Sequence, residues 1–199
     1  EGRVDYLTKY IKGASENKQE NYALNLLLFS AFIESCSLFS QFYIVKSFFQ
    51  KRQKLKTIDN IIMATAKEED VHFQFGVALI NIIKKEYPEW FNEDFYNKIR
   101  RACKKAYEAE LKIIDWIFSG EDLEFLSKKD VEVFIQDRFN KALFEIGIEP
   151  MFEVDLEQLG ESAKWFEEER VLDVRVDFFD VQSPNYTIGQ QDISAESLF

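Results

Sequence analysis

The stretch ATAKEEDVHFQFG, residues 64–76, contains the only histidine of the chain, His72, three residues after Glu69. Residues three apart lie on one face of a helix. That face is predicted to be buried, because Ile62 and Ile83 fall on it at helical spacing. The sequence therefore predicts a carboxylate and an imidazole side by side on the inner face of a long helix.

A second acid falls inside the preceding apolar run, YALNLLLFSAFIESCSLFSQFYIVKSFF, residues 22–49, where Glu34 lies on the predicted inner face. A buried carboxylate without a partner is costly unless it stays protonated. A divalent cation between Glu34, Glu69 and His72 would remove that cost, and carboxylate and imidazole ligands suit iron and manganese. Each residue alone also has a simpler interpretation, namely a hydrogen-bonded core histidine and a buried acid paired with a lysine.

Composition narrows the class of protein. The chain has 199 residues, of which 46% are hydrophobic, with only 7 Gly and 3 Pro, which favours one all-α domain. The net charge of -11 argues against nucleic acid as a partner. Glu34 at the middle of residues 22–49 argues against a membrane span. Cys36 and Cys103 are predicted to be buried free thiols in a reducing, cytoplasmic compartment.

The chain is predicted to divide into three parts. Residues 1–21 form a polar lead-in, residues 22–146 form the helical part, and residues 147–199 form an extended, mobile C-terminal tail. Four long helices are expected in the middle part. They run from about Tyr22 to Lys51, from Thr57 (a predicted N-cap) to Tyr87, from Asn92 to a stop at Gly120, and from a Ser127/Asp130 cap to Ile146.

The pattern resembles a known family. Ferritin-like dinuclear-metal bundles use one Glu from each of two helices and Glu-x-x-His from each of the other two, and this chain has one of each. AKEEDVH (residues 66–72) and FSAFIESCSLFSQF (29–42) resemble two ligand helices of the small, radical-generating subunit of class I ribonucleotide reductase. DFFDVQSPNYTIGQQD (177–192) resembles that family's tail. The resemblance covers roughly residues 22–199 and implies a partial ferritin-like helical bundle.

The resemblance also implies roles for individual residues at the metal site. The metal ligands would be Glu34, Glu69 and His72, and Glu68 would be the acid beside the ligand glutamate. The wall of the radical site would comprise Leu38, Phe42 and Thr65, where the family more often has Phe and Ile in place of Leu38 and Thr65. The cofactor implied is a dinuclear metal centre, iron in the first place, with manganese or a mixed centre as alternatives.

In the tail, the resemblance makes Tyr186 the residue that relays a radical to the large subunit, with Asp180 where the family usually has Glu. Leu198 and Phe199 form an apolar pair that could dock on that large subunit. The family's other ligands and its radical tyrosine would lie upstream of Glu1. The chain is therefore expected to be the C-terminal half of a small subunit, completed by an N-terminal half and paired in a small-subunit dimer.

The implied function is part of ribonucleoside-diphosphate reductase, an oxidoreductase that converts ribonucleotides to deoxyribonucleotides for DNA replication. Without the N-terminal half and the large subunit, the chain is expected to be inactive. Two alternatives remain open from the residues. One is another ferritin-like di-metal oxidase or an iron-storage protein, which would lack the tyrosine-bearing tail, and the other is a metal-free helical interaction module.

Overall fold

The fold is all-α. The computed structural model describes residues 19–172 together with residues 4, 5 and 8. The named elements are α2 (Gln19–Leu28), the π-helix η1 (Phe29–Ser37), α3 (Phe39–Arg52), α4 (Lys56–Glu86), the 3-10 turn η2 (Pro88–Trp90), α5 (Glu93–Ile117), α6 (Lys128–Glu145) and α7 (Leu156–Leu172). No strand occurs among these described residues, in agreement with the predicted fold class.

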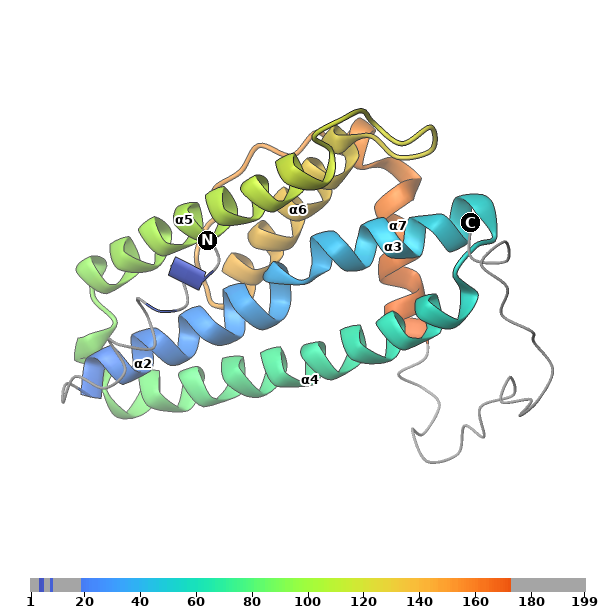
Figure 1. Cartoon of the computed structure of the whole chain (residues 1–199). Helices are drawn as coiled ribbons and strands as arrows, with labels where there is room; N and C mark the ends of the chain where they lie inside the picture. Colours follow the sequence, from blue (N-terminus) through green and yellow to red (C-terminus); the bar gives the residue numbers. More distant parts are fainter. Residues whose placement is uncertain (1–3, 6–7, 9–18, 173–199) are drawn as a thin grey trace.

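The long helices pack as a bundle around a central rod formed by α2, η1 and α3 (Figure 1). The rod contacts α4 along one side and α6 along the other, and α5 packs on α6. It is long and apolar enough to cross a membrane by length and composition, but 61% of its most apolar window is buried inside the protein. This burial favours the predicted core helix over a membrane span.

The central rod differs from the single α-helix expected over residues 22–51. Its middle, Phe29–Ser37, is π-helical, and the α-helical bonding resumes only after Leu38. Leu38 and Phe42, which follow Glu34 at helical spacing and so share its predicted inner face, are half-buried. The large side chains buried in and after the π-helix include instead Phe32, Cys36, Phe39 and Tyr43. The prediction assumed one uniform α-helical period, and the wider π turn rotates the residues after it onto a different face.

Sequence signals identified two helix caps correctly and one incorrectly. The side chain of Asn92 accepts the N–H of Phe95 at the start of α5, and Ser127 with Asp130 forms a reciprocal capping box on α6. Helix α4, however, begins without the expected Thr57 cap. The chain turns through Leu55 in the left-handed region (φ 62°), and the first turn of α4 is fixed to α3 by a buried ion pair.

Helix α7 corrects the prediction that residues 147–199 are extended. Leu156–Leu172 is helical, with a kink at Gly160 (φ 44°) that breaks the apolar period and hides the helix from the sequence pattern. Phe166 of α7 is fully buried, and its ring packs against the rings of Phe39, Tyr43 and Phe134. The helix is therefore part of the folded bundle. Residues 173–199 lie outside the described residues.

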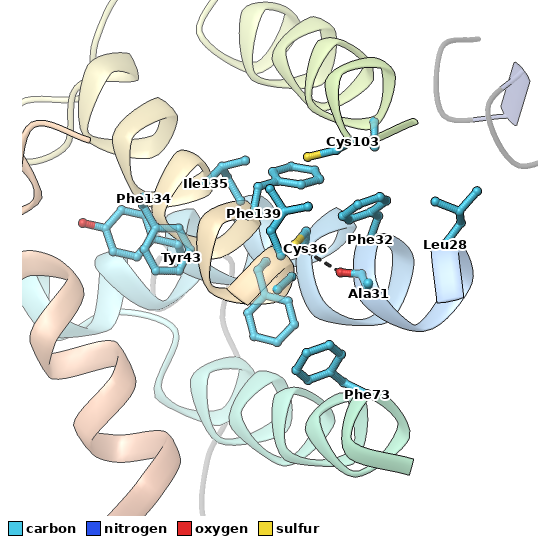
Figure 2. Packing of buried hydrophobic residues seen from close by; sticks show 14 of the residues in the cluster. Leu28, Ala31, Phe32, Cys36, Tyr43, Phe73, Cys103, Phe134, Ile135 and Phe139 are labelled. Atoms are coloured by element: carbon cyan, nitrogen blue, oxygen red, sulfur yellow. Dashed lines mark hydrogen bonds between the residues drawn. The ribbon is translucent and has the colours of Figure 1, made fainter. Parts of the chain in front are cut away.

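The two cysteines are buried and free, as predicted. Figure 2 shows Cys36 and Cys103 within the aromatic core, among Phe32, Phe139 and their neighbours. The Cys36 thiol lies 3.5 Å from the carbonyl oxygen of Ala31, to which it donates a hydrogen bond. Burial raises the pKa of Cys36 to about 12 and also raises the pKa of Cys103, so both remain protonated thiols at neutral pH.

Candidate metal-binding site

Glu34, Glu69 and His72, the predicted ligand set, come together in the fold. Glu34 lies in η1, Glu69 and His72 lie one turn apart in α4, and η1 packs directly on α4. His72 Nδ1 is 3.8 Å from Glu34 Oε1 and 3.6 Å from Glu69 Oε2. One potential ligand atom from each residue lies within 4.8 Å of the others.

The trio lies at the edge of the bundle rather than inside it, which corrects the expectation of a fully buried site. The side chains of Glu34 and Glu69 are 16% and 18% exposed, whereas that of His72 is 57% exposed. The buried face of α4 runs through Met63, Ala66, Phe73, Gly76 and Ile80. Among the described residues, one side of the cluster is therefore open to solvent.

The electrostatics of the cluster favour a cation. Burial raises the pKa of the Glu34 carboxyl. The nearby Glu69 carboxylate raises this pKa further, while His72 and a hydrogen bond with Ser30 lower it. Burial and the neighbouring carboxylate thus disfavour the ionised form of Glu34, and a cation bound beside it would favour that form.

The donor set fits a first-row metal ion. Two carboxylates and one imidazole are ligands that iron and manganese accept. Bonds from such ions to N and O ligands are about 2.0–2.2 Å, so ligand atoms on one ion lie at most about 4.4 Å apart. The separations of 3.6 and 3.8 Å from His72 Nδ1 lie within this limit, and the ligand atoms of the two carboxylates lie within 4.8 Å of each other. Three side chains cannot, however, fill the coordination of two ions, and the open side of the cluster is where further ligands would enter.

The π-helix gives Glu34 its place in the cluster. Single π-helical turns within α-helices are rare and occur frequently at functional sites. Ser37 Oγ donates to the carbonyl of Phe32 at 2.9 Å, five residues earlier, which matches the wider turn. The sequence pattern did not predict this turn, although Glu34 with Ser30, Ser35 and Ser37 around it was an unusual set of polar residues for an apolar helix.

Gly76 allows η1 to approach α4 closely beside the cluster. A Cβ atom at Gly76 would overlap both Cβ and Oγ of Ser30, the residue that hydrogen bonds to Glu34. Gly76 is thus required for the distance between the two helices that carry the trio. An isolated glycine within a helical pattern is the sequence signal for such an approach.

Changing Gly76 to alanine is expected to destabilise the fold and to disturb Glu34. Overpacking costs about 1–3 kcal/mol, and the higher helix propensity of alanine returns about 1 kcal/mol. Because a Cβ at Gly76 would lie far inside van der Waals contact with Cβ of Ser30, the upper part of the overpacking range applies, and the free energy of unfolding should fall by about 1–2 kcal/mol in a denaturant titration. Gly120→Ala is the matched control, because a Cβ there meets no atom within 4 Å. Equal stability of the two variants would contradict the close approach.

The other predicted site residues are less closely tied to the cluster. Glu68 is exposed, next to Glu69. Leu38, Phe42 and Thr65 are half-buried; the Phe42 ring packs on Phe39, and the Thr65 hydroxyl donates to Ile61 O. Their role as a radical-site wall stays a prediction. The predicted tail residues lie outside the described residues: Asp180, Tyr186, Leu198 and Phe199.

Fold and site together define a helical-bundle protein of the ferritin-like class with a carboxylate–histidine cluster between two of its helices. Similar solved structures are a putative class I ribonucleotide reductase from Bacillus halodurans (TM-score 0.73, 18% identity, 84% of this chain and 58% of that one) and the ribonucleotide reductase R2 subunit from Clostridium botulinum (TM-score 0.73, 19% identity, 84% and 51%). These likenesses establish the fold.

The family model for the small chain of ribonucleotide reductase matches residues 1–159. The chain belongs to this family. Similar proteins are the ribonucleoside-diphosphate reductase subunit beta of Chlamydia pneumoniae (23% identity, 92% of this chain and 51% of that protein) and a probable small subunit of Invertebrate iridescent virus 3 (26% identity, 73% and 39%). The chain spans about half the length of the first of these relatives and less of the second.

Proposed function

We propose that this chain forms part of the radical-generating small subunit of ribonucleoside-diphosphate reductase and supplies half of a dinuclear metal site. The observation that carries the proposal is the Glu34–Glu69–His72 cluster between η1 and α4, in a chain of the ribonucleotide reductase small-chain family. The assembled enzyme would reduce ribonucleoside diphosphates to deoxyribonucleotides on a large subunit, as the names of the relatives suggest.

In this proposal the metal centre, when bound, supplies the redox chemistry that generates an oxidising equivalent. Glu34 and Glu69 would provide carboxylate oxygens, and His72 would provide Nδ1, the ring nitrogen nearest both carboxylates. Iron is the first choice, with manganese or a mixed centre compatible with the same donors. Glu68 would add negative charge beside the site. Leu38, Phe42 and Thr65 would form the wall of the radical site.

The remaining ligands would come from an N-terminal half, which would cover the open side of α4. That side carries a row of exposed apolar side chains at intervals of seven residues or a multiple: Ile61 (59% exposed), Phe75 (67%) and Ile82 (52%), with Val71 (67%) beside them. Such an apolar stripe marks a packing surface. Because His72 lies on this exposed side, a helix packed there could complete the metal site. The match covers 51% of the Chlamydia relative, so that protein contains further chain of a length that could cover such a surface.

The test is metal stoichiometry with and without the N-terminal half. The chain alone should self-associate through its apolar stripe and should not hold two tightly bound ions, because three side chains are too few for a dinuclear centre. Mixing with the N-terminal half should give a defined complex with two ions per pair, measured by light scattering and elemental analysis. Two tightly bound ions on a lone, monodisperse chain would refute the split-site proposal.

The tail would serve the large subunit in two ways. Leu198 and Phe199 would provide docking affinity, and Tyr186 would relay the radical, since a phenol can transfer an electron and a proton together. A cytoplasmic location and small-subunit dimerisation belong to the same proposal; the free thiols Cys36 and Cys103 support a reducing compartment.

Changing Tyr186 to phenylalanine is expected to abolish nucleotide reduction by the assembled enzyme while metal content and large-subunit binding stay near wild type. The aromatic ring remains, but the transferable O–H is lost. Removal of Leu198 and Phe199 should instead weaken binding to the large subunit. Near wild-type turnover of the Tyr186→Phe protein would show that the relay assignment is wrong.

A further inference from the structure

The position of Glu34 depends on the helical register of η1. Successive residues of an α-helix are about 100° apart around the axis. If the π turn moved along the chain by one residue, or reverted to α-helix, Glu34 would turn away from Glu69 and His72. Because π turns are intrinsically unfavourable and occur mostly as single turns, this register must be stabilised by other contacts.

Some of these contacts lie within η1 itself. Cys36 Sγ donates to Ala31 O at 3.5 Å and Ser37 Oγ donates to Phe32 O at 2.9 Å, each spanning five residues. Such bonds stabilise the wide turn but cannot orient it within the bundle, since donor and acceptor move together. A contact from another helix is needed for that.

Arg138 of α6 supplies such a contact at the residue next to Glu34. Its Nε and Nη2 both donate to the carbonyl oxygen of Ser35, at 3.1 and 2.7 Å. Its guanidinium lies 3.7 Å from the centre of the Phe39 ring, and Nη1 donates to Glu167 of α7 at 3.0 Å. Arg138 is only 4% exposed. A buried guanidinium group of α6 therefore forms two hydrogen bonds to a backbone carbonyl of η1.

We infer that Arg138 is a positioning residue: by holding the Ser35 carbonyl it fixes the register of η1 and aims Glu34 at Glu69 and His72. The inference rests on the proposed metal site for its functional meaning, but its structural part stands on the contacts alone. Two donors in a rigid fork fix the carbonyl in direction as well as distance, which the single ammonium group of lysine does not do.

The decisive variant is Arg138→Lys, which keeps the positive charge opposite Glu167 but loses the paired hydrogen bonds to the Ser35 carbonyl. Glu167→Gln is the matched control, because it removes the ion pair between Arg138 and Glu167 and leaves those hydrogen bonds in place. Asp59→Asn is the control for general destabilisation, since Asp59 pairs with Lys46 between α3 and α4. All three are made in the full chain and measured by amide hydrogen exchange and, after mixing with the N-terminal half, by Mn²⁺ titration followed by electron paramagnetic resonance.

In Arg138→Lys, exchange over residues 29–40 should rise at least about tenfold relative to the rest of the bundle. Mn²⁺ affinity should fall about 10- to 100-fold, as for other residues that orient a metal ligand. Glu167→Gln should change neither the exchange over residues 29–40 nor the Mn²⁺ affinity. Asp59→Asn should lower the unfolding midpoint without raising exchange selectively at residues 29–40.

Exchange in Arg138→Lys that rises evenly over the bundle, or that matches the Asp59→Asn pattern, would overturn the inference and leave Arg138 as an ordinary packing residue. Selective exchange at residues 29–40 with unchanged Mn²⁺ affinity would overturn its link to Glu34. A wild-type chain that binds no Mn²⁺ even when mixed with the N-terminal half would count against the metal site of the proposed function, and the exchange pattern would then decide the role of Arg138 by itself.

Discussion

His72→Ala is expected to lower the metal affinity of the assembled small subunit by more than about 100-fold, beyond the effect of losing a residue that only orients a ligand. His72 is the only histidine of the chain, and its Nδ1 lies within 3.8 Å of both carboxylates. Its side chain is 57% exposed, so its removal should leave no cavity and cost little stability. Elemental analysis and a metal titration, with an unfolding curve of each variant, would measure both effects.

Glu108→Gln is the control for His72→Ala, because it removes an exposed carboxylate of α5 outside the cluster and should bind metal as the wild type does. A His72→Ala protein with unchanged metal content would exclude His72 as a ligand. A protein that instead loses metal and unfolds at a much lower denaturant concentration would indicate that the histidine contributes to folding rather than coordination.

Asp59→Asn is expected to cost about 3–5 kcal/mol of unfolding free energy, the usual effect of removing one partner from a buried ion pair. Lys46 Nζ lies 2.7 Å from Asp59 Oδ1, and the two side chains are 0% and 8% exposed. The substitution would leave the Lys46 ammonium buried without the carboxylate charge opposite it. Chemical denaturation followed by circular dichroism would measure the loss.

Two further variants test whether the loss of stability comes from the broken buried ion pair. The double change Lys46→Met with Asp59→Leu should recover much of the stability, because a buried ion pair can often be replaced by apolar residues without loss. Glu124→Gln breaks the exposed pair with Arg52, close to the same α3–α4 connection, and should leave the unfolding midpoint unchanged. A loss in Asp59→Asn no larger than in Glu124→Gln would contradict the importance of the buried pair.

Local signals in the sequence determined most of the secondary structure and the identity of the candidate site. Asn92 and the Ser127/Asp130 box predicted the starts of α5 and α6 because a cap depends on residues within one turn. The three-residue spacing of Glu69 and His72 put them on one helix face for the same reason. That Glu34 meets them was predicted from the cost of burying a carboxylate and from the family resemblance, and the fold brings the three together.

Only the tertiary structure decided the register of η1, the exposure of His72 and the place of α7. The π turn is held by contacts such as those of Arg138, which is 103 residues from Ser35 in the chain, so no local period reveals it. The exposure of His72 depends on which helices cover α4. Gly160 interrupts the apolar period of α7. The place of this helix in the bundle is fixed by the burial of Phe166 against Phe39, Tyr43 and Phe134. Periodicity reports which residues share a face, whereas the partner of that face is set by packing between segments far apart in sequence.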